Sequence, residues 1–250
     1  MVESLEQETT SNISSYSKLV YTRNVIACIP AYNEEESIFD VIKATENFVK
    51  KVLVCNDGSI DNTSEVVKKT QATLLSQEKK MGKGFTLRTL FREAIKLDPE
   101  VIITLDADNQ HNPSDIPVLL KEIMRNGSDI VVGSRFVKGA HTDISKWRLF
   151  GLNVINYLQN ALTNCSVIDS QSGFRAFTKD AFSVVLESRE DGYTIESEQL
   201  FLAAEKGIKV TEVPITVKYK GLHSTSKKNF IVHGLELVNY ILRYYIKKRF

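Results

Sequence analysis

The chain of 250 residues is long enough to form one large domain with its own hydrophobic core. Its 32 Lys and Arg residues nearly balance its 31 Asp and Glu residues, and this overall charge gives no sign of a nucleic-acid-binding protein. Cys28, Cys55 and Cys165 lie far apart, which excludes a close-spaced zinc motif and fits a reducing compartment.

The order of apolar and polar segments predicts alternating strands and helices. Residues 1–22 are polar and partly acidic, and we expect a weakly ordered tail there, not a signal peptide. Strands are expected at 25–29, 52–55, 73–75, 101–105 and 130–133, and helices from the loop at 30–35 to about 50, after the loop at 56–63 to about 71, at 83–97 and at 115–126. This alternation implies an α/β fold with a mostly parallel sheet and helices on both faces. No apolar run approaches the roughly 18–20 residues of a membrane-spanning helix.

The most informative polar residues lie in VIITLDADNQ at 101–110. A run suited to a buried strand leads into Asp106 and Asp108, and Gln110 follows two positions later. If the chain stays extended past the strand, these alternate side chains share one face and converge. Their oxygen atoms suit Mg²⁺ or Mn²⁺ that also binds a substrate phosphate. The alternative is a polar loop after a strand.

Polar clusters also follow the first two expected strands, at 30–35 and 56–63. Ligands of open parallel sheets bind beyond the carboxyl ends of the strands, so one crevice can collect all three clusters. Each cluster also has a structural interpretation, because Pro, Asn, Asp and Gly are common in turns and helix caps. Gly82-Lys83-Gly84 lacks the P-loop spacing, so it predicts a tight turn before a helix, with Lys83 as a minor candidate for a nucleotide contact.

Six segments together resemble a known enzyme family. They are IPAYNEEESI at 29–38, NDGSIDNT at 56–63, LDADNQH at 105–111, GSRFVKG at 133–139, SQSGFRAF at 170–177 and GIKVTEVPI at 207–215. In this order and spacing they are similar to the inverting glycosyltransferases of family 2, whose GT-A fold has a Rossmann-like sheet. LDADNQH, followed by the segment at 126–139, most resembles the polyprenyl-phosphate (dolichyl-phosphate) hexose synthases. The resemblance implies transfer of a sugar from a UDP- or GDP-sugar to a polyprenyl phosphate at the cytoplasmic membrane face.

The resemblance also implies roles for individual residues. The candidates for the nucleotide site are Pro30, Tyr32, Glu34, Asp57, Lys83, Asp106, Ala107 and Lys227. The candidates for holding Mg²⁺ or Mn²⁺ on the donor diphosphate are Asp106, Asp108 and Gln110. The candidates for catalysis or for holding the acceptor are Asp108, Arg135, Arg148 and Glu198. Asn56 departs from the family, which usually has an acid there, so the base contact falls to Asp57 and the nucleotide base stays open.

The implied chemistry follows from charge. The leaving diphosphate gathers negative charge, which a divalent metal and Lys227 would stabilise. A phosphate acceptor is already anionic and needs cations such as Arg135 and Arg148, although both arginines also suit an ordinary protein surface. A sugar hydroxyl acceptor would instead need a general base, for which Glu196 and Glu198 are candidates. Both acids also suit the first turn of a helix at 195–206.

Two further residues near these segments have open roles. Arg175 lies in an expected glycine-containing loop at 172–175, where it contacts phosphate or pairs with Asp169 or Asp180. We expect His111 to support the site and not to bind the metal, because oxygen ligands already suit the metal. A sugar hydroxyl acceptor and a non-catalytic nucleotide-sugar-binding protein stay as alternative functions.

The last segment predicts an amphipathic helix. Apolar residues recur at helical spacing as Ile231, Leu235, Val238, Leu242 and Tyr245. Together with Tyr240, Tyr244 and the closing basic residues at 247–249, they suit an anionic membrane surface. Packing on the protein's own core or in a homo-oligomer is the alternative. The expected organisation is a tail at 1–22, a catalytic domain at 23–228 and this helix at 229–250.

Overall fold

The computed structural model describes residues 23–142, 144, 146–163, 166–218 and 230–249. In this part of the chain seven strands form one sheet in the order β3-β2-β1-β4-β7-β5-β8. The strands are β1 (Val25–Ala31), β2 (Lys51–Asn56), β3 (Thr73–Ser76), β4 (Val101–Thr104), β5 (Ile130–Ser134), β7 (Arg175–Thr178) and β8 (Val210–Pro214). Two short strands, β6 (His141–Thr142) and β9 (Thr216–Val217), pair separately.

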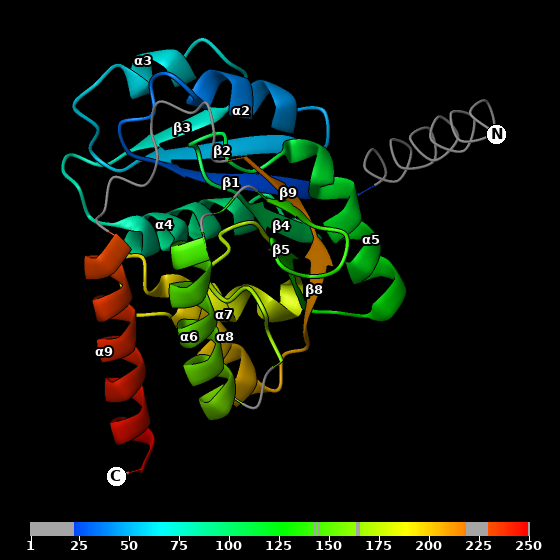
Figure 1. Ribbon diagram of the computed structural model, residues 1–250. Helices are drawn as coiled ribbons and strands as arrows, with labels where there is room; N and C mark the ends of the chain where they lie inside the picture. Colours follow the sequence, from blue (N-terminus) through cyan, green and yellow to red (C-terminus); the bar gives the residue numbers. More distant parts are fainter. Residues whose placement is uncertain (1–22, 143, 145, 164–165, 219–229, 250) are drawn as a thin grey trace.

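Helices cover both faces of the large sheet, which confirms the predicted α/β architecture (Figure 1). One face packs against α2 (Ile38–Thr45), α3 (Thr63–Val67) and α5 (Ile116–Asn126). The other face packs against α4 (Lys83–Ile95), α7 (Phe182–Leu186) and α8 (Ile195–Lys206). The helices α6 (Lys146–Thr163) and α9 (Phe230–Arg249) and the 3-10 turns η1 (Pro113–Asp115) and η2 (Lys179–Ala181) complete the description. The helices after β1 and β2 are shorter than expected.

Strand β7 interrupts the parallel order, and the sequence did not predict it. It runs antiparallel to both neighbours, β4 and β5, and Arg175 at its start pairs with Thr104 at the end of β4. An antiparallel neighbour begins where β4 ends. The segment before β7 therefore borders the acids that follow β4. A strand of four residues that begins with a buried arginine gives no recognisable apolar pattern.

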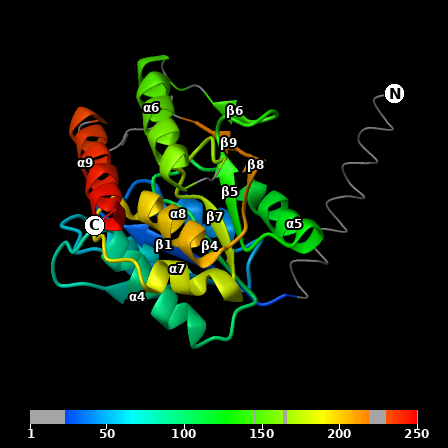
Figure 2. The ribbon, with the colours of Figure 1, turned by 90° about the horizontal axis from the view of Figure 1, so that it is seen from below.

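Helix α9 packs on the domain through a different face from the expected one. Leu237 and Ile241 are buried, and the ring of Tyr244 stacks on Phe201 of α8 at a centroid distance of 3.9 Å. Figures 1 and 2 show α9 running beside α6, which it contacts. The apolar residues of α9 lie on more than one face of the helix. The face that contains Leu237, Ile241 and Tyr244 packs against the rest of the domain. The expectation that Tyr244 serves a membrane surface is therefore wrong.

The face of α9 that we expected to be apolar points outward. Leu235 is 66% exposed and Leu242 is 54% exposed, and Phe150 and Tyr157 on the adjoining helix α6 are also exposed. Within the described ranges, no helix combines the length and the hydropathy that crossing a bilayer requires.

Candidate active site

The three polar clusters meet in one open pocket of about 430 Å³ at the carboxyl ends of β1, β2 and β4. The candidate residues that line it are Pro30, Tyr32, Glu34, Asp57, Lys83, Asp106, Ala107, Asp108, Gln110 and Arg135. Residues that line it without having been singled out as candidates include Lys80, Gln171, Gly173 and Tyr193. This volume lies within the range of small-molecule sites, roughly 300–1,000 Å³.

The acids after β4 converge through a turn and not through the extended path that we expected. The chain turns at residues 107–109, and Asn109 adopts a positive φ of 59°. The carboxylate of Asp108 accepts a hydrogen bond from the backbone N–H of Gln110 at 3.0 Å, which stabilises the turn. Asp106, Asp108 and Gln110 nevertheless all line the pocket. Asparagine tolerates the left-handed conformation that this turn requires.

A lysine whose side chain is 11% exposed links two acids of the pocket. The Lys83 ammonium lies 2.6 Å from Oδ1 of Asp106 and 2.7 Å from Oε1 of Glu196. Burial would lower the pKa of Lys83, but the two carboxylates raise it overall. Lys83 is thus a positively charged group in the lining of the pocket. From the sequence, Lys83 was only a minor candidate for a nucleotide contact.

The two aspartates of the turn differ in their electrostatic environment. Burial and the neighbouring charge of Asp106 raise the pKa of Asp108 to about 7. Burial would also raise the pKa of Asp106, but the charge and hydrogen bond of Lys83, together with smaller contributions from neighbouring groups, outweigh this effect, and the pKa of Asp106 is lowered. The close like charges at Asp106 and Asp108 would be stabilised by a cation that both can bind.

The side chains in this region fit a divalent metal that is shared with a substrate. Asp106 and Asp108 supply hard oxygen atoms, and Mg²⁺ commonly uses one or two carboxylates together with substrate phosphates and water. The Nδ1 atom of His111 is buried and has no hydrogen-bond partner among the described residues. Burial lowers the pKa of His111 to about 4, so the neutral ring is a further candidate ligand, which we did not expect. In the described part of the chain, no group of three or more His, Cys, Asp or Glu side chains is placed to hold a metal.

The part of the pocket formed by the loops after β1 and β2 combines an aromatic ring with polar groups. The Lys80 ammonium lies 3.8 Å from the ring centroid of Tyr32, a cation–π contact that the sequence did not reveal. Asp57 accepts hydrogen bonds from the backbone N–H groups of Met81 at 2.6 Å and Gly82 at 2.9 Å. Asp57 therefore fixes the loop that carries Lys80, in addition to lining the pocket.

Neighbouring residues hold the loops of this side in place. Asn56 accepts a hydrogen bond from Ser59 N–H and donates one to Ser64 Oγ, a combination that a carboxylate cannot provide. Ser37 Oγ donates to the carbonyl of Ala107 at 2.8 Å and lies 3.1 Å from the carboxylate of Glu34. The Ser37 contacts join the loops after β1 and β4, and Asn56 holds the loop after β2.

The structure separates Glu196 and Glu198, which the sequence left equivalent. Glu196 lines the pocket and contacts Lys83. The carboxylate of Glu198 instead accepts hydrogen bonds from the backbone N–H groups of Arg189 and Glu190, and it is not among the lining residues. This position gives no support to the catalytic role expected for Glu198.

Three cationic candidates have different outcomes. Arg175 is fully buried and donates to the carbonyls of Ser170 and Ser172 and to the side chain of Gln199, so the expected phosphate contact and acid partners are wrong. Arg148 lies in α6, but its side chain is outside the described part. Lys227 lies outside the described residues altogether.

The loop that carries Tyr193 crosses the start of α4 at very short range. Gly84 N–H donates to the carbonyl of Asp191 at 2.7 Å, and a Cβ atom at Gly84 would lie 2.0 Å from the carbonyl oxygen of Glu190. Arg88 donates to that same carbonyl at 2.9 Å and pairs with the Asp191 carboxylate. Glycine at position 84 is therefore required for this contact.

We expect Gly84→Ala to displace this loop, lower stability by about 1–3 kcal/mol and weaken nucleotide binding. Urea unfolding and calorimetry with a uridine or guanosine diphosphate measure the two effects. The control is Gly234→Ala in α9, where a Cβ atom would meet nothing within 4 Å, so stability should not fall. Equal behaviour of the two variants would contradict the contact.

Comparison with known proteins identifies the family. The model of glycosyl transferase family 2 matches residues 26–186. The chain is a family 2 glycosyltransferase. This family 2 glycosyltransferase is 32% identical over 225 residues to the UDP-N-acetylglucosamine–dolichyl-phosphate N-acetylglucosaminyltransferase of Methanococcus voltae, covering 81% of this chain and 86% of the relative. It is 33% identical over 205 residues to the dolichol-phosphate mannosyltransferase of Pyrococcus furiosus, covering 77% and 56% of the two chains.

Solved structures confirm the fold of this family 2 glycosyltransferase. Glucosyl-3-phosphoglycerate synthase from Mycobacterium tuberculosis, crystallised with Mn²⁺, UDP and its product, superposes with a TM-score of 0.70 at 18% identity. The match covers 92% of this chain and 83% of the synthase. The same synthase has also been crystallised with Mg²⁺ and UDP. The predicted GT-A fold and glycosyltransferase activity are confirmed.

Proposed function

We propose that this glycosyltransferase uses Mg²⁺ or Mn²⁺ to transfer a sugar from a UDP- or GDP-sugar to a polyprenyl phosphate. The observation that carries the proposal is that Asp106, Asp108 and Arg135 line one pocket. The acids suit a metal-bound diphosphate, and the guanidinium suits a phosphate acceptor. The names of relatives that act on dolichyl phosphate support this choice of acceptor.

The donor would lie across the carboxyl ends of β1, β2 and β4. Tyr32 and Lys80 offer a ring face and a cation to the nucleotide, and Asp57 orders the loop between them. A divalent metal held by Asp106 and Asp108 would supply Lewis-acid stabilisation of the leaving diphosphate. The Lys83 ammonium, next to Asp106, adds positive charge where the departing oxygen becomes negative.

The acceptor would approach from the opposite side of the sugar. An oxygen of its phosphate forms the new bond to the anomeric carbon as the bond to the diphosphate breaks, so the configuration inverts. A phosphate monoester is anionic near neutral pH and requires no base to remove a proton. Arg135 would bind its remaining oxygen atoms and reduce the repulsion between the two anions.

A transfer assay tests the proposal directly. The protein is incubated with radiolabelled UDP- and GDP-sugars, a short-chain polyprenyl phosphate and Mn²⁺. We expect label to enter the organic phase with one of the donors and to stay in the aqueous phase when EDTA replaces Mn²⁺. Label that stays in the aqueous phase for every donor tested would refute the lipid acceptor.

A sugar hydroxyl acceptor is the second candidate, because Glu196 lines the pocket and could act as a base. If a phosphate is the acceptor, Glu196→Gln should lower kcat only mildly, about tenfold or less, through its contact with Lys83. If a hydroxyl is the acceptor, loss of the base should lower kcat by about 10²–10⁴-fold. Initial rates measured with each acceptor distinguish the two candidate functions. The matched control is Glu187→Gln, which removes an exposed ion pair with Lys206.

The location that fits this function is peripheral, on the cytoplasmic face of a membrane, with α6 and α9 toward the lipid. Leu235 and Leu242 on α9 and Phe150 and Tyr157 on α6 expose apolar side chains. The basic residues at 247–249 end the same helix. Sedimentation with anionic vesicles tests this placement, and an oligomer through the same face would appear as a larger mass in solution.

A further inference from the structure

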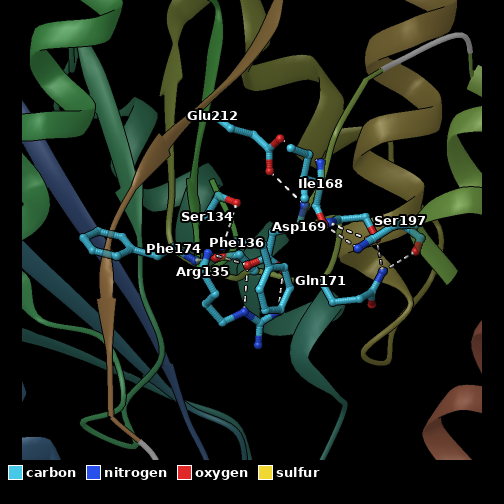
Figure 3. Close-up of polar contacts among 12 residues, drawn as sticks. Ser134, Arg135, Phe136, Ile168, Asp169, Gln171, Phe174, Ser197 and Glu212 are labelled. Carbon is cyan, nitrogen blue, oxygen red and sulfur yellow. Dashed lines mark hydrogen bonds and ion pairs between the residues drawn. The ribbon is translucent and has the colours of Figure 1, made fainter. Parts of the chain in front are cut away.

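Arg135 is held by a fully buried carboxylate on the segment before β7. Asp169 Oδ2 accepts hydrogen bonds from the backbone N–H of Arg135 at 2.9 Å and from its Nε at 2.7 Å, and Oδ1 accepts one from Nη2. The contact therefore engages one side of the guanidinium with both carboxylate oxygens (Figure 3). A bidentate contact of this kind fixes the direction of the guanidinium plane as well as its position.

A residue of the sheet fixes the backbone at Asp169. Glu212 on β8 accepts hydrogen bonds from the backbone N–H of Ile168 at 2.7 Å and of Asp169 at 2.8 Å, as Figure 3 shows. Strand β8 pairs with β5, which ends at Ser134 next to Arg135. The carboxylate and the arginine that it holds are thus both fixed to the same pair of strands.

Helix α6 holds the same segment from its other side. Asn156 donates to the carbonyl of Ile168 and accepts hydrogen bonds from the backbone N–H of Ser170 at 3.1 Å and from its hydroxyl at 2.6 Å. The side chains of Glu212 and Asn156 therefore hold the backbone of residues 168–170 from two sides. Such support is typical of groups whose position matters to within a fraction of an ångström.

The position of the pair indicates a role beyond stability. A buried ion pair that only stabilised the fold would contribute little compared with well-packed apolar side chains. Here Arg135 lines the same pocket as Asp106 and Asp108. A guanidinium that must meet a phosphate beside the donor needs a fixed direction, because small misplacements of reacting groups are costly.

We propose that Asp169 is a positioning residue that aims Arg135 at the phosphate of the acceptor. The inference rests on the proposed function, because it assumes an anionic acceptor. Asp169 does not contact the substrate and acts through Arg135. Without its carboxylate, the arginine side chain would retain its charge but adopt several directions.

Steady-state kinetics of Asp169→Asn test this role. We expect the KM for short-chain polyprenyl phosphate to rise about ten- to hundredfold, because the arginine is no longer aimed. The KM for the sugar nucleotide and the rate of donor hydrolysis without acceptor should stay within about twofold of wild type. Asp98→Asn, which removes an exposed ion pair with Lys179, is the control and should leave all these values unchanged.

A double-mutant cycle distinguishes positioning from general stability. The variants are Asp169→Asn, Arg135→Gln and the combination of the two. If Asp169 acts only through Arg135, the combination should bind the acceptor no more weakly than Arg135→Gln alone. Additive losses, or a parallel loss of donor hydrolysis and acceptor binding, would overturn the proposal.

Arg135→Lys keeps the test decisive if Asp169→Asn does not fold. Lysine retains the charge but cannot make the side-on contact, so we expect the same increase in acceptor KM. A near-normal acceptor KM for Arg135→Lys would overturn the proposal. If wild-type protein transfers no sugar to any polyprenyl phosphate, the proposed function fails and this inference fails with it. Normal wild-type transfer with unaffected variants refutes the inference alone.

Discussion

Replacement of Asp108 by asparagine is expected to reduce sugar transfer by about a hundred- to thousandfold while making the metal-free protein more stable. The loss follows from removing one of the two carboxylates that fit a divalent metal. The gain follows from removing a poorly solvated charge, because burial and the neighbouring charge of Asp106 raise the pKa of Asp108 to about 7. Initial rates and calorimetric titration with Mn²⁺ measure the first effect, and urea unfolding without metal measures the second.

The stability gain should depend on pH in a defined direction. The folded-state pKa of Asp108 lies above the unfolded value, so its protonated form stabilises the folded state at low pH. That contribution is lost as the pH rises toward about 7. We therefore expect the free energy of unfolding of Asp108→Asn to be about 1–3 kcal/mol larger than that of wild type at about pH 8. Near pH 4 the two values should be equal.

A matched variant separates this effect from a general change of charge. Asp180→Asn removes an exposed acid that lies outside the pocket, so neither transfer nor Mn²⁺ binding should change. Unchanged Mn²⁺ affinity in Asp108→Asn would contradict the role of Asp108 as a ligand. Lower stability than wild type at pH 8 would contradict the electrostatic argument.

Lys83→Met is expected to destabilise the protein by about 3–5 kcal/mol and to abolish measurable transfer. Its ammonium lies between Asp106 and Glu196, and methionine would leave the buried carboxylate of Glu196 and the partly buried carboxylate of Asp106 without their cation. Urea unfolding monitored by circular dichroism measures the loss. Adding Glu196→Gln to Lys83→Met should restore part of the stability, because one of the two uncompensated charges is removed.

The same helix offers the control for Lys83. Lys96 forms an exposed ion pair with Glu93 on α4, so Lys96→Met should change stability by about 0.5 kcal/mol or less. Wild-type stability of Lys83→Met would show that the buried pair contributes nothing. Full transfer activity in that variant would exclude Lys83 from the chemistry of the leaving group.

Local pattern was enough to predict the first half of the fold and the proposed donor side of the pocket. The strands that became β1, β2 and β4 are short apolar runs that each end in a polar cluster, and parallel strands bring such ends together. The clusters that contain Tyr32, Asp57, Asp106 and Asp108 could therefore be placed at the strand ends, while the individual roles of Tyr32 and Asp57 came from the family resemblance. The exact path was not predictable, because the turn after β4 depends on a hydrogen bond between Asp108 and Gln110.

The proposed acceptor side depends on contacts between segments far apart in the sequence, which the sequence did not predict. Asp169 contacts Arg135, 34 positions earlier, and Glu212 contacts Asp169, 43 positions later. Neither acid has a periodic or neighbouring signal that indicates its partner. The sequence also could not show which of Glu196 and Glu198 faces the pocket, because that choice depends on the loop that crosses α4.

The sequence by itself determined the fold class, the family and the acids that converge at the strand ends, since these follow from apolar periodicity and short motifs. Only the tertiary structure decided that β7 enters the sheet antiparallel, that Lys83 joins two carboxylates and that Asp169 fixes Arg135. The physical reason is that the packing of the whole core determines the order of the strands and which side chains are buried. The partner of a buried charge is whichever group that packing brings within hydrogen-bonding distance.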